Sequence, residues 1–130
     1  MPVGKIKRDM EIQFSKKGDL QILQVKGKIR LQSWRVLDKH LETLLAKGSR
    51  WVALDLSGVD LICSTGIGAL MHNIRKFQEK ESSLLLVASS PYVQDLFQIF
   101  GFETYIGDHI FLNWPILEKR LRSQGLALVG

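Results

Sequence analysis

The chain has 130 residues, of which 45% are hydrophobic and 24% charged, and its formal net charge is +5. This length suits one domain that buries its own core, and the single cysteine, Cys63, excludes an internal disulfide. No apolar run approaches the roughly 20 residues of a membrane-spanning helix, and the first ten residues do not form a secretory signal. We therefore expect one cytoplasmic domain over residues 1–130 without membrane insertion, with its core at about 11–122 and peripheral segments at 1–10 and 123–130.

The positive charge is concentrated near the N-terminus. Only one aromatic residue, Phe14, lies between the basic residues there, so they lack the series of stacking platforms that single-stranded bases need: Lys5, Lys7, Arg8, Lys16, Lys17, Lys26, Lys28 and Arg30. We interpret them as a solvated surface or as a surface for an acidic protein partner, and we expect no direct binding of nucleic acid.

The first predicted elements are a hairpin and a helix. Residues 11–14 alternate polar and apolar side chains as a half-buried strand does, residues 16–19 are turn formers, and residues 20–25 read as the partner strand. Ser33 is the predicted N-cap of a helix that runs to about Lys47, with Gly48 at its C-terminal end. Its apolar face comprises Trp34, Leu37, Leu41, Leu44 and Leu45.

The middle of the chain alternates buried strands with amphipathic helices. Residues 51–56 and 84–88 are short apolar runs, typical of strands covered on both faces. Between them, a helix beginning near Gly66 has an apolar stripe of Ile67, Leu70, Met71, Ile74 and Phe77. After the second run, Ser89 or Ser90 caps a third helix, with Pro91 in its first turn and Gly101 at its end. The inward stripe of this helix is Val93, Leu96, Phe97 and Phe100.

The last elements are less regular. Residues 103–106 read as a short final strand, and Asn113 as the N-cap of a last helix that directs Ile116, Leu117 and Leu121 inward. The tail at 123–130 either packs on the sheet or frays. The resulting order, β-β-α-β-α-β-α-β-α, predicts an α/β fold with a mixed sheet, in which an antiparallel hairpin joins parallel strands packed with about four helices.

Enzyme motifs mostly fail in this sequence. Gly66-Ile67-Gly68 begins like a dinucleotide-binding loop, but Met71 occupies the position of the third glycine. Ser64 does not lie in G-x-S-x-G, because Ile62 stands at the first glycine position. The histidines, His40, His72 and His109, have no metal-ligand spacing, and we expect His40 and His72 to be exposed. The sequence predicts no metal and no cofactor, and an enzyme that uses Ser64 or Cys63 has no base nearby in the chain.

Two adjacent hydroxyls, Ser64 and Thr65, precede a glycine and an amphipathic helix. One of them is the predicted N-cap of that helix. A helix N-terminus also tolerates a phosphate, because it presents unpaired N–H groups and the positive end of the helix dipole. Gly66 and Gly68 lack side-chain bulk, so another protein can approach the hydroxyls closely. These features favour a docking surface controlled by phosphorylation.

The segment Asp55–Leu70, DLSGVDLICSTGIGAL, resembles the signature of STAS domains of the anti-sigma factor antagonist type. In that signature a strand ending in D-L-S-x-V is followed by D-[ST]-[ST]-G-[LI]-G and a helix. The likeness extends over about Glu11–Leu121 and includes Gly27 and the stretch VQDLFQIFGFETYI. The chain departs from the family at Cys63, which replaces an aspartate, and at residues 28–30, where acidic residues are common in the family.

The resemblance implies the STAS fold and a regulatory protein that is not an enzyme. It implies partner switching: the protein binds an anti-sigma factor that is a serine/threonine kinase, and phosphorylation of the hydroxyl after the motif aspartate ends the interaction. By position the phosphoacceptor is Ser64, with Thr65 as the second choice. The implied partner-binding residues are Asp60, Leu61, Cys63, Ser64, Thr65, Gly66, Gly68 and Arg30. Cys63 favours the alternative, a STAS interaction module that is not phosphorylated and serves a signalling or lipid-transport complex.

Overall fold

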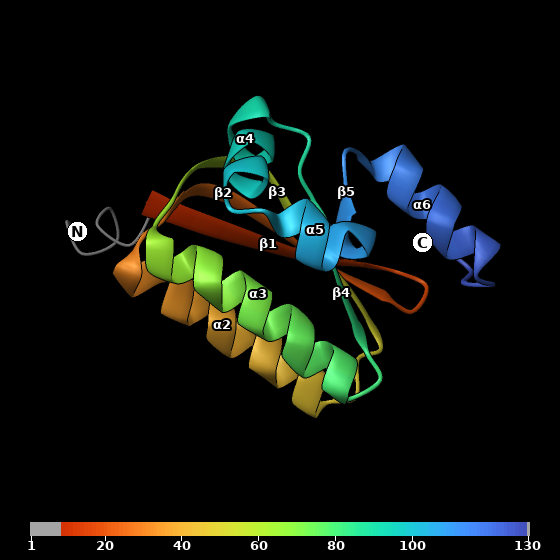
Figure 1. Ribbon diagram of the computed structural model, residues 1–130. Helices are drawn as coiled ribbons and strands as arrows, with labels where there is room; N and C mark the ends of the chain where they lie inside the picture. Colours follow the sequence, from red (N-terminus) through yellow and green to blue (C-terminus); the bar gives the residue numbers. More distant parts are fainter. Residues whose placement is uncertain (1–8, 130) are drawn as a thin grey trace.

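The computed structural model describes residues 9–129 and is shown in Figure 1. The predicted arm at 1–10, with Lys5, Lys7 and Arg8, lies largely outside the described residues. The strands are β1 (Met10–Lys17), β2 (Leu20–Ile29), β3 (Trp51–Ile62), β4 (Ser83–Val87) and β5 (Ile110–Phe111). The helices are α2 (Leu31–Ala46), α3 (Ser64–Glu79), α4 (Pro91–Ile99), α5 (Phe102–Ile106) and α6 (Trp114–Ser123), with a 3-10 turn, η2, at Gly107–His109.

The five strands form one mixed sheet in the order β1-β2-β3-β4-β5. β1 and β2 are antiparallel, and the other neighbours are parallel. A two-residue turn at Gly18 and Asp19 joins the hairpin, and Gly18 has a φ of 57°, which suits a glycine at the first turn position. The predicted fold class is therefore confirmed.

The helices cover the two faces of the sheet unequally. α2, α3, α4 and α5 pack on one face and enclose the larger hydrophobic cluster, whereas α6 covers the other face with Leu117 and Leu121 (Figure 1). Successive strand residues serve opposite faces: Ala53 belongs to the smaller cluster, and its neighbours Val52 and Leu54 belong to the larger one. This alternation explains why the central strands are continuous apolar runs.

Three predictions about the elements are wrong. Residues 103–106 belong to helix α5, not to a strand, and the last strand is β5. Gly101 takes a left-handed conformation with a φ of 69°, which ends α4 and starts α5 at once. Phe100 and Ile116, which we expected to point inward, are 46% and 47% exposed. Phe102 takes the interior position instead and stacks on Phe97, with ring centroids 4.7 Å apart.

Strand β3 is longer than the expected 51–56 and continues to Ile62. It does so because β2 also extends, and the two strands pair in parallel as far as Lys28 with Leu61 and Ile29 with Ile62. The C-terminal tail lies beside the hairpin turn, where the Gly18 N–H donates to the Val129 carbonyl at 2.7 Å. No helix of the described part of the chain is long and apolar enough to cross a membrane.

Candidate functional site

The candidate site lies where β2 and β3 end and where α2 and α3 begin, at neighbouring helix starts in Figure 1. The Cys63 N–H donates to the Ile29 carbonyl at 2.9 Å and ties the two strand ends together. Ser64 and Thr65 are the first residues of α3, and both are exposed. The Ser64 hydroxyl makes no hydrogen bond with any residue in 9–129. It is therefore free to meet a partner.

The N-cap of α3 is Cys63 and not Ser64 or Thr65, which corrects the prediction. The Cys63 Sγ accepts a hydrogen bond from the Gly66 N–H at 3.3 Å. A thiol is a weak acceptor, but here it occupies the position in which a cap side chain meets the third helical N–H. Because the thiol makes this contact, neither neighbouring hydroxyl is used by the fold.

The two glycines of this helix start have different roles. Gly66 is buried, and a Cβ there would lie 3.2 Å from the Ile29 Cγ2 and 3.3 Å from the Ile62 Cγ2. Its missing side chain thus lets α3 approach the strand ends, and it does not expose a docking surface. Gly68 is exposed, and a Cβ there would meet no atom within 4 Å. Of the two, only Gly68 leaves open space at the surface beside the hydroxyls.

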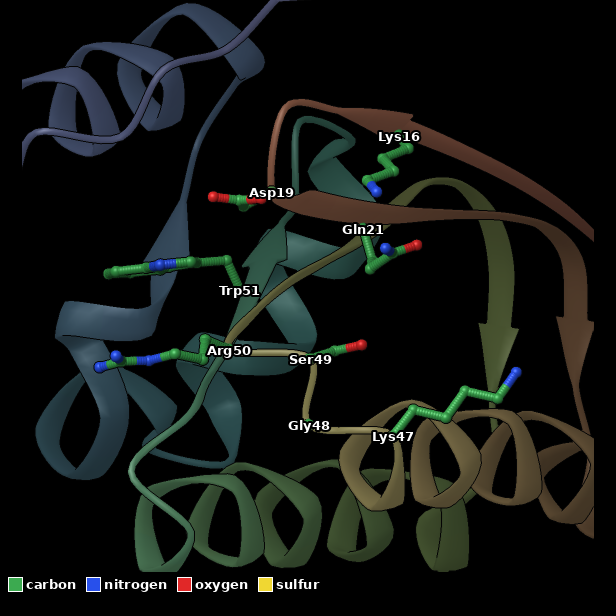
Figure 2. A pocket seen from close by; sticks show the side chains of 8 residues that line it. All are labelled: Lys16, Asp19, Gln21, Lys47, Gly48, Ser49, Arg50 and Trp51. Carbon is green, nitrogen blue, oxygen red and sulfur yellow. The ribbon is translucent and has the colours of Figure 1, made fainter.

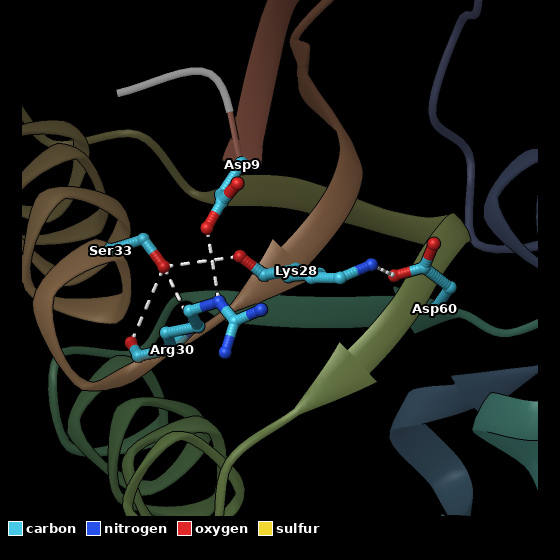
Figure 3. A network of polar contacts seen from close by, with 5 residues as sticks. All are labelled: Asp9, Lys28, Arg30, Ser33 and Asp60. Carbon is cyan, nitrogen blue, oxygen red and sulfur yellow. Dashed lines mark hydrogen bonds and ion pairs between the residues drawn. The ribbon is translucent and has the colours of Figure 1, made fainter. Parts of the chain in front are cut away.

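Charged side chains form the rim of the site (Figure 3). The Asp60 side chain is 64% exposed and pairs with Lys28, with 3.2 Å between Oδ1 and Nζ. The Arg30 Nε donates to the Asp9 carboxylate at 3.0 Å, and both side chains are about half exposed. Exposed pairs of this kind contribute about 0–1 kcal/mol, so a partner can replace them at little cost.

Ser33 belongs to this rim as well, but not as the predicted N-cap of α2. The N-cap is Arg30, and Ser33 lies in the first turn. The Ser33 Oγ accepts from the Arg30 N–H at 2.7 Å and donates to the Lys28 carbonyl at 3.1 Å (Figure 3). These bonds fix the backbone of Arg30, a predicted partner-binding residue, at the helix start.

Two residues that the sequence analysis did not assign, Tyr92 and Asp55, make polar contacts along β3, the strand that leads to the site. The Tyr92 hydroxyl accepts from the Ile62 N–H at 3.1 Å and so connects α4 to the end of β3. Asp55, the first residue of the recognised segment, is only 7% exposed and accepts from the Trp114 Nε1 at 2.7 Å and from the Ser57 N–H at 2.9 Å. The aspartate in D-L-S is therefore a structural link to α6. The sequence could have indicated this, because a carboxylate in a buried strand needs a hydrogen-bond donor.

The face of α2 and α3 next to the site contains an open hollow. Trp34, Asp38, Thr65 and His72 are among the residues that line it. Buried Asn73 joins the two helices beside it, because its Nδ2 donates to the Asp38 carboxylate at 2.7 Å. His72 is exposed, as expected. The Asn73–Asp38 hydrogen bond connects α2 and α3 behind their first turns.

A second hollow, of about 420 Å³, lies at the opposite end of the sheet, where β2 and β3 begin. Figure 2 shows that its polar side chains diverge: Lys16 and Lys47 lie on one side of the strands, and Arg50 and Trp51 point to the other. Among residues 9–129, no group of three or more His, Cys, Asp or Glu side chains could hold a metal ion. The two adjacent exposed hydroxyls, Ser64 and Thr65, are at the other end of the sheet, where we place the candidate site.

Comparison with known proteins identifies the fold and the family. The sequence family described as "Mlab, STAS domain" matches residues 12–113, which is most of the chain. The chain belongs to the STAS domain family. It is also 27% identical over 93 residues to BtrV of Bordetella bronchiseptica, whose name assigns it to the anti-sigma factor antagonists. That similarity covers 72% of this chain and 80% of BtrV.

Solved structures share the STAS fold at low sequence identity. A crystal structure of an anti-sigma factor antagonist from Mycobacterium paratuberculosis has a TM-score of 0.77 at 18% identity and covers 87% of this chain and 94% of its own. The anti-sigma factor antagonist SpoIIAA in its unphosphorylated form has a TM-score of 0.70 at 16% identity, covering 90% and 99%. A sulfate transporter family protein from Wolinella succinogenes has a TM-score of 0.61 at 19% identity, covering 76% and 81%.

Proposed function

We infer that this chain is a cytoplasmic anti-sigma factor antagonist, that it binds a serine/threonine kinase acting as an anti-sigma factor, and that phosphorylation of Ser64 ends this binding. The observation that carries the inference is the exposed Ser64 hydroxyl at the first residue of α3, without a hydrogen bond to any described residue. The relation to BtrV and membership of the STAS family support the class of function. We keep Thr65, its exposed neighbour, as the second acceptor.

The switch is an electrostatic change on a docking surface. A phosphate adds about −1.5 to −2 charges at neutral pH. Within this chain the α3 N-terminus accommodates that charge, because its first N–H groups and helix dipole favour anions. At a closed interface the same charge must lose its water and also occupies the space of the partner. Phosphorylation thus blocks docking while it leaves the fold intact.

The docking surface consists of the predicted partner-binding residues, two of which take a structural role. The accessible part comprises Asp60, Leu61, Ser64, Thr65, Gly68 and Arg30. Cys63 and Gly66 act from below: Cys63 caps the helix, and Gly66 sets the distance between α3 and the strand ends. Lys28, which pairs with Asp60, joins the surface as a residue that the partner can engage.

The test compares Ser64→Ala and Ser64→Asp against the purified anti-sigma factor kinases of the source organism by calorimetry, with and without ATP. We expect Ser64→Ala to bind with or without ATP, and Ser64→Asp to bind at least about tenfold more weakly than wild type. Thr104→Asp is the matched control, because Thr104 is exposed on α5, away from this surface. If Ser64→Asp binds as tightly as Thr104→Asp, the phosphorylation switch is wrong.

The second candidate function is a STAS interaction module in a signalling or lipid-transport complex that needs no phosphate. Three observations favour it: the family description names Mlab, a sulfate transporter family protein shares the fold, and Cys63 replaces the motif aspartate. Mass spectrometry after incubation with kinase and ATP separates the two functions. Phosphate on Ser64 or Thr65 supports the switch, whereas an unmodified chain that still binds its partner supports the module.

A further inference from the structure

The outer edge of β1 is the long edge of the sheet, and no strand within residues 9–129 pairs with it. β1 has eight residues and lies at one end of the strand order, whereas β5, at the other end, has two. Among residues 9–129, β1 pairs with β2 alone, and the nearest backbone bond to another segment is from the Gly18 N–H, in the turn, to the Val129 carbonyl. A free edge presents a row of N–H and C=O groups that can pair with another strand.

The hairpin geometry determines which groups face outward. The two-residue turn closes on the pair Lys17 and Leu20, and the register continues without a bulge to Met10 and Gly27. In an antiparallel ladder, residues alternate between bonding to the partner strand and pointing away from it. Since Lys17 bonds to Leu20, the outward groups belong to the even-numbered residues of β1: Met10, Ile12, Phe14 and Lys16.

Apolar surface borders this edge on the side of α2. Phe14 is 56% exposed, and its ring meets the ring of His40 edge-on, with centroids 4.9 Å apart. His40 is therefore half-buried, which corrects the expectation that it is exposed. Val36, one helical turn before His40, is 50% exposed. An added strand alone would cover only the backbone groups of the β1 edge. A folded partner domain that contributes this strand would also cover the exposed side chains of Phe14 and Val36.

The sequence of β1 is complementary to itself in one antiparallel register. With a twofold axis at Gln13, Ile12 lies opposite Phe14 of the other copy, and Met10 lies opposite Lys16, whose aliphatic stem can cover the thioether. All four outward residues then find a partner. An axis at Phe14 would instead place Met10 against Gly18, whose N–H is already bonded to Val129.

Charge supports the same register. Glu11 lies near the start of β1 and Lys17 at its end. With the axis at Gln13, Glu11 lies diagonal to Lys17 of the other copy, a lysine that also pairs with Glu118 of its own chain at 3.2 Å. The antiparallel arrangement therefore brings opposite charges near each other at both ends of the paired strands, whereas a parallel one would align like charges.

We propose that the β1 edge is a homodimer interface, in which two copies of this chain pair antiparallel about Gln13 and extend their sheets into one. Dimerisation leaves the Ser64 hydroxyl of each copy accessible, because Ser64 follows β3, which lies two strands away from the paired edge, whereas Asp9 in the rim of the site lies beside that edge. The dimer would thus present two docking surfaces.

Site-directed cross-linking tests both the interface and its register. In a Cys63→Ser background, we expect Gln13→Cys to form an intermolecular disulfide in mild oxidant, because residues of a non-hydrogen-bonded pair have Cα atoms about 4.5 Å apart, within disulfide range. Glu11→Cys and Ser15→Cys should each fail alone but cross-link when the two proteins are mixed. Equal cross-linking of all three single variants, or none for Gln13→Cys, overturns the proposal.

Sedimentation of the wild type and two variants gives an independent test. Phe14→Lys places a charge opposite Ile12 of the other copy and should weaken dimerisation at least about tenfold. Ile99→Lys is the matched control, since Ile99 is 76% exposed on α4. A wild type that stays monomeric at every concentration, or equal effects of the two lysines, refutes the interface. Urea denaturation establishes that each variant is folded.

Discussion

The thiol cap of α3 leads to a direct prediction about stability and site geometry. Cys63 occupies the position where the family has an aspartate, and its Sγ accepts the Gly66 N–H at 3.3 Å. Thiol sulfur is a weak acceptor, whereas aspartate and serine oxygens are among the preferred N-cap groups. We therefore predict that Cys63→Asp and Cys63→Ser both stabilise the protein.

The magnitude follows from the cap and from the helix dipole. An N-cap oxygen is worth about 0.5–2 kcal/mol over alanine, and the existing thiol supplies part of this. For Cys63→Ser we expect a gain of about 0.5 kcal/mol. For Cys63→Asp we expect about 1 kcal/mol, because a carboxylate at a helix N-terminus adds about 0.3–1 kcal/mol and α3 has no acidic residue in its first turn. The half-buried position of Cys63 limits the gain through partial desolvation of the carboxylate.

Urea denaturation followed by circular dichroism measures these differences, and Cys63→Ala provides the lower reference. The expected order of unfolding free energy is aspartate, serine, cysteine, alanine. High salt should reduce the advantage of aspartate over serine, because the dipole interaction is screened and the hydrogen bond is not. If Cys63→Ala is as stable as the wild type, the thiol is not a cap; if Cys63→Asp is the least stable, burial outweighs capping and the reasoning is refuted.

Two further predictions concern the helix start and the opposite face of the sheet. Gly66→Ala should lower the free energy of unfolding by about 1 kcal/mol, because the added methyl group meets the buried Ile29. Gly68→Ala should raise the free energy of unfolding by up to about 1 kcal/mol, because its site is open and alanine favours a helix. Thermal unfolding of the two variants checks these opposite signs. Trp114→Phe should lower the free energy of unfolding by about 1.5–3 kcal/mol, because Asp55 is then buried without its indole donor. Asp55→Asn should lower the free energy of unfolding by less. Equal stability of Trp114→Phe and wild type would contradict this role of the Asp55–Trp114 hydrogen bond.

The sequence was sufficient for elements whose local and long-range signals agree. The hairpin has alternating side chains and a glycine turn, and α3 and α4 have apolar stripes that all meet the same sheet face. Ser90 and Asn113 cap their helices as predicted, each accepting a backbone N–H in the first turn. At these positions a preferred cap residue stands directly before an apolar period, so no tertiary contact was needed to decide.

The errors arise where tertiary contacts override the local pattern. Gly58 and Asp60 resemble turn residues, yet they lie in β3, because pairing with β2 extends the strand beyond its apolar run. The short segment from Phe102 to Ile106 fits either a strand or one helical turn. It is a helix, and as a helix it buries the side chains at both of its ends, Phe102 and Ile106. The cap of α3 could not be foreseen, because cysteine is not a preferred cap residue and only the placed Sγ reveals the contact.

The two departures from the family pattern act on the candidate site in the same direction. Replacing an aspartate by Cys63 removes a negative charge from the residue before Ser64. Arg30 adds a positive charge on the neighbouring chain segment, since the Cys63–Ile29 backbone bond places Ser64 and Arg30 one residue beyond a bonded pair. Arg30 is held by Asp9 in an exposed pair that contributes little. An anion at Ser64 is therefore opposed by less like charge here than beside an aspartate, so any loss of binding on phosphorylation must originate in the interface with the partner and not in strain within this chain.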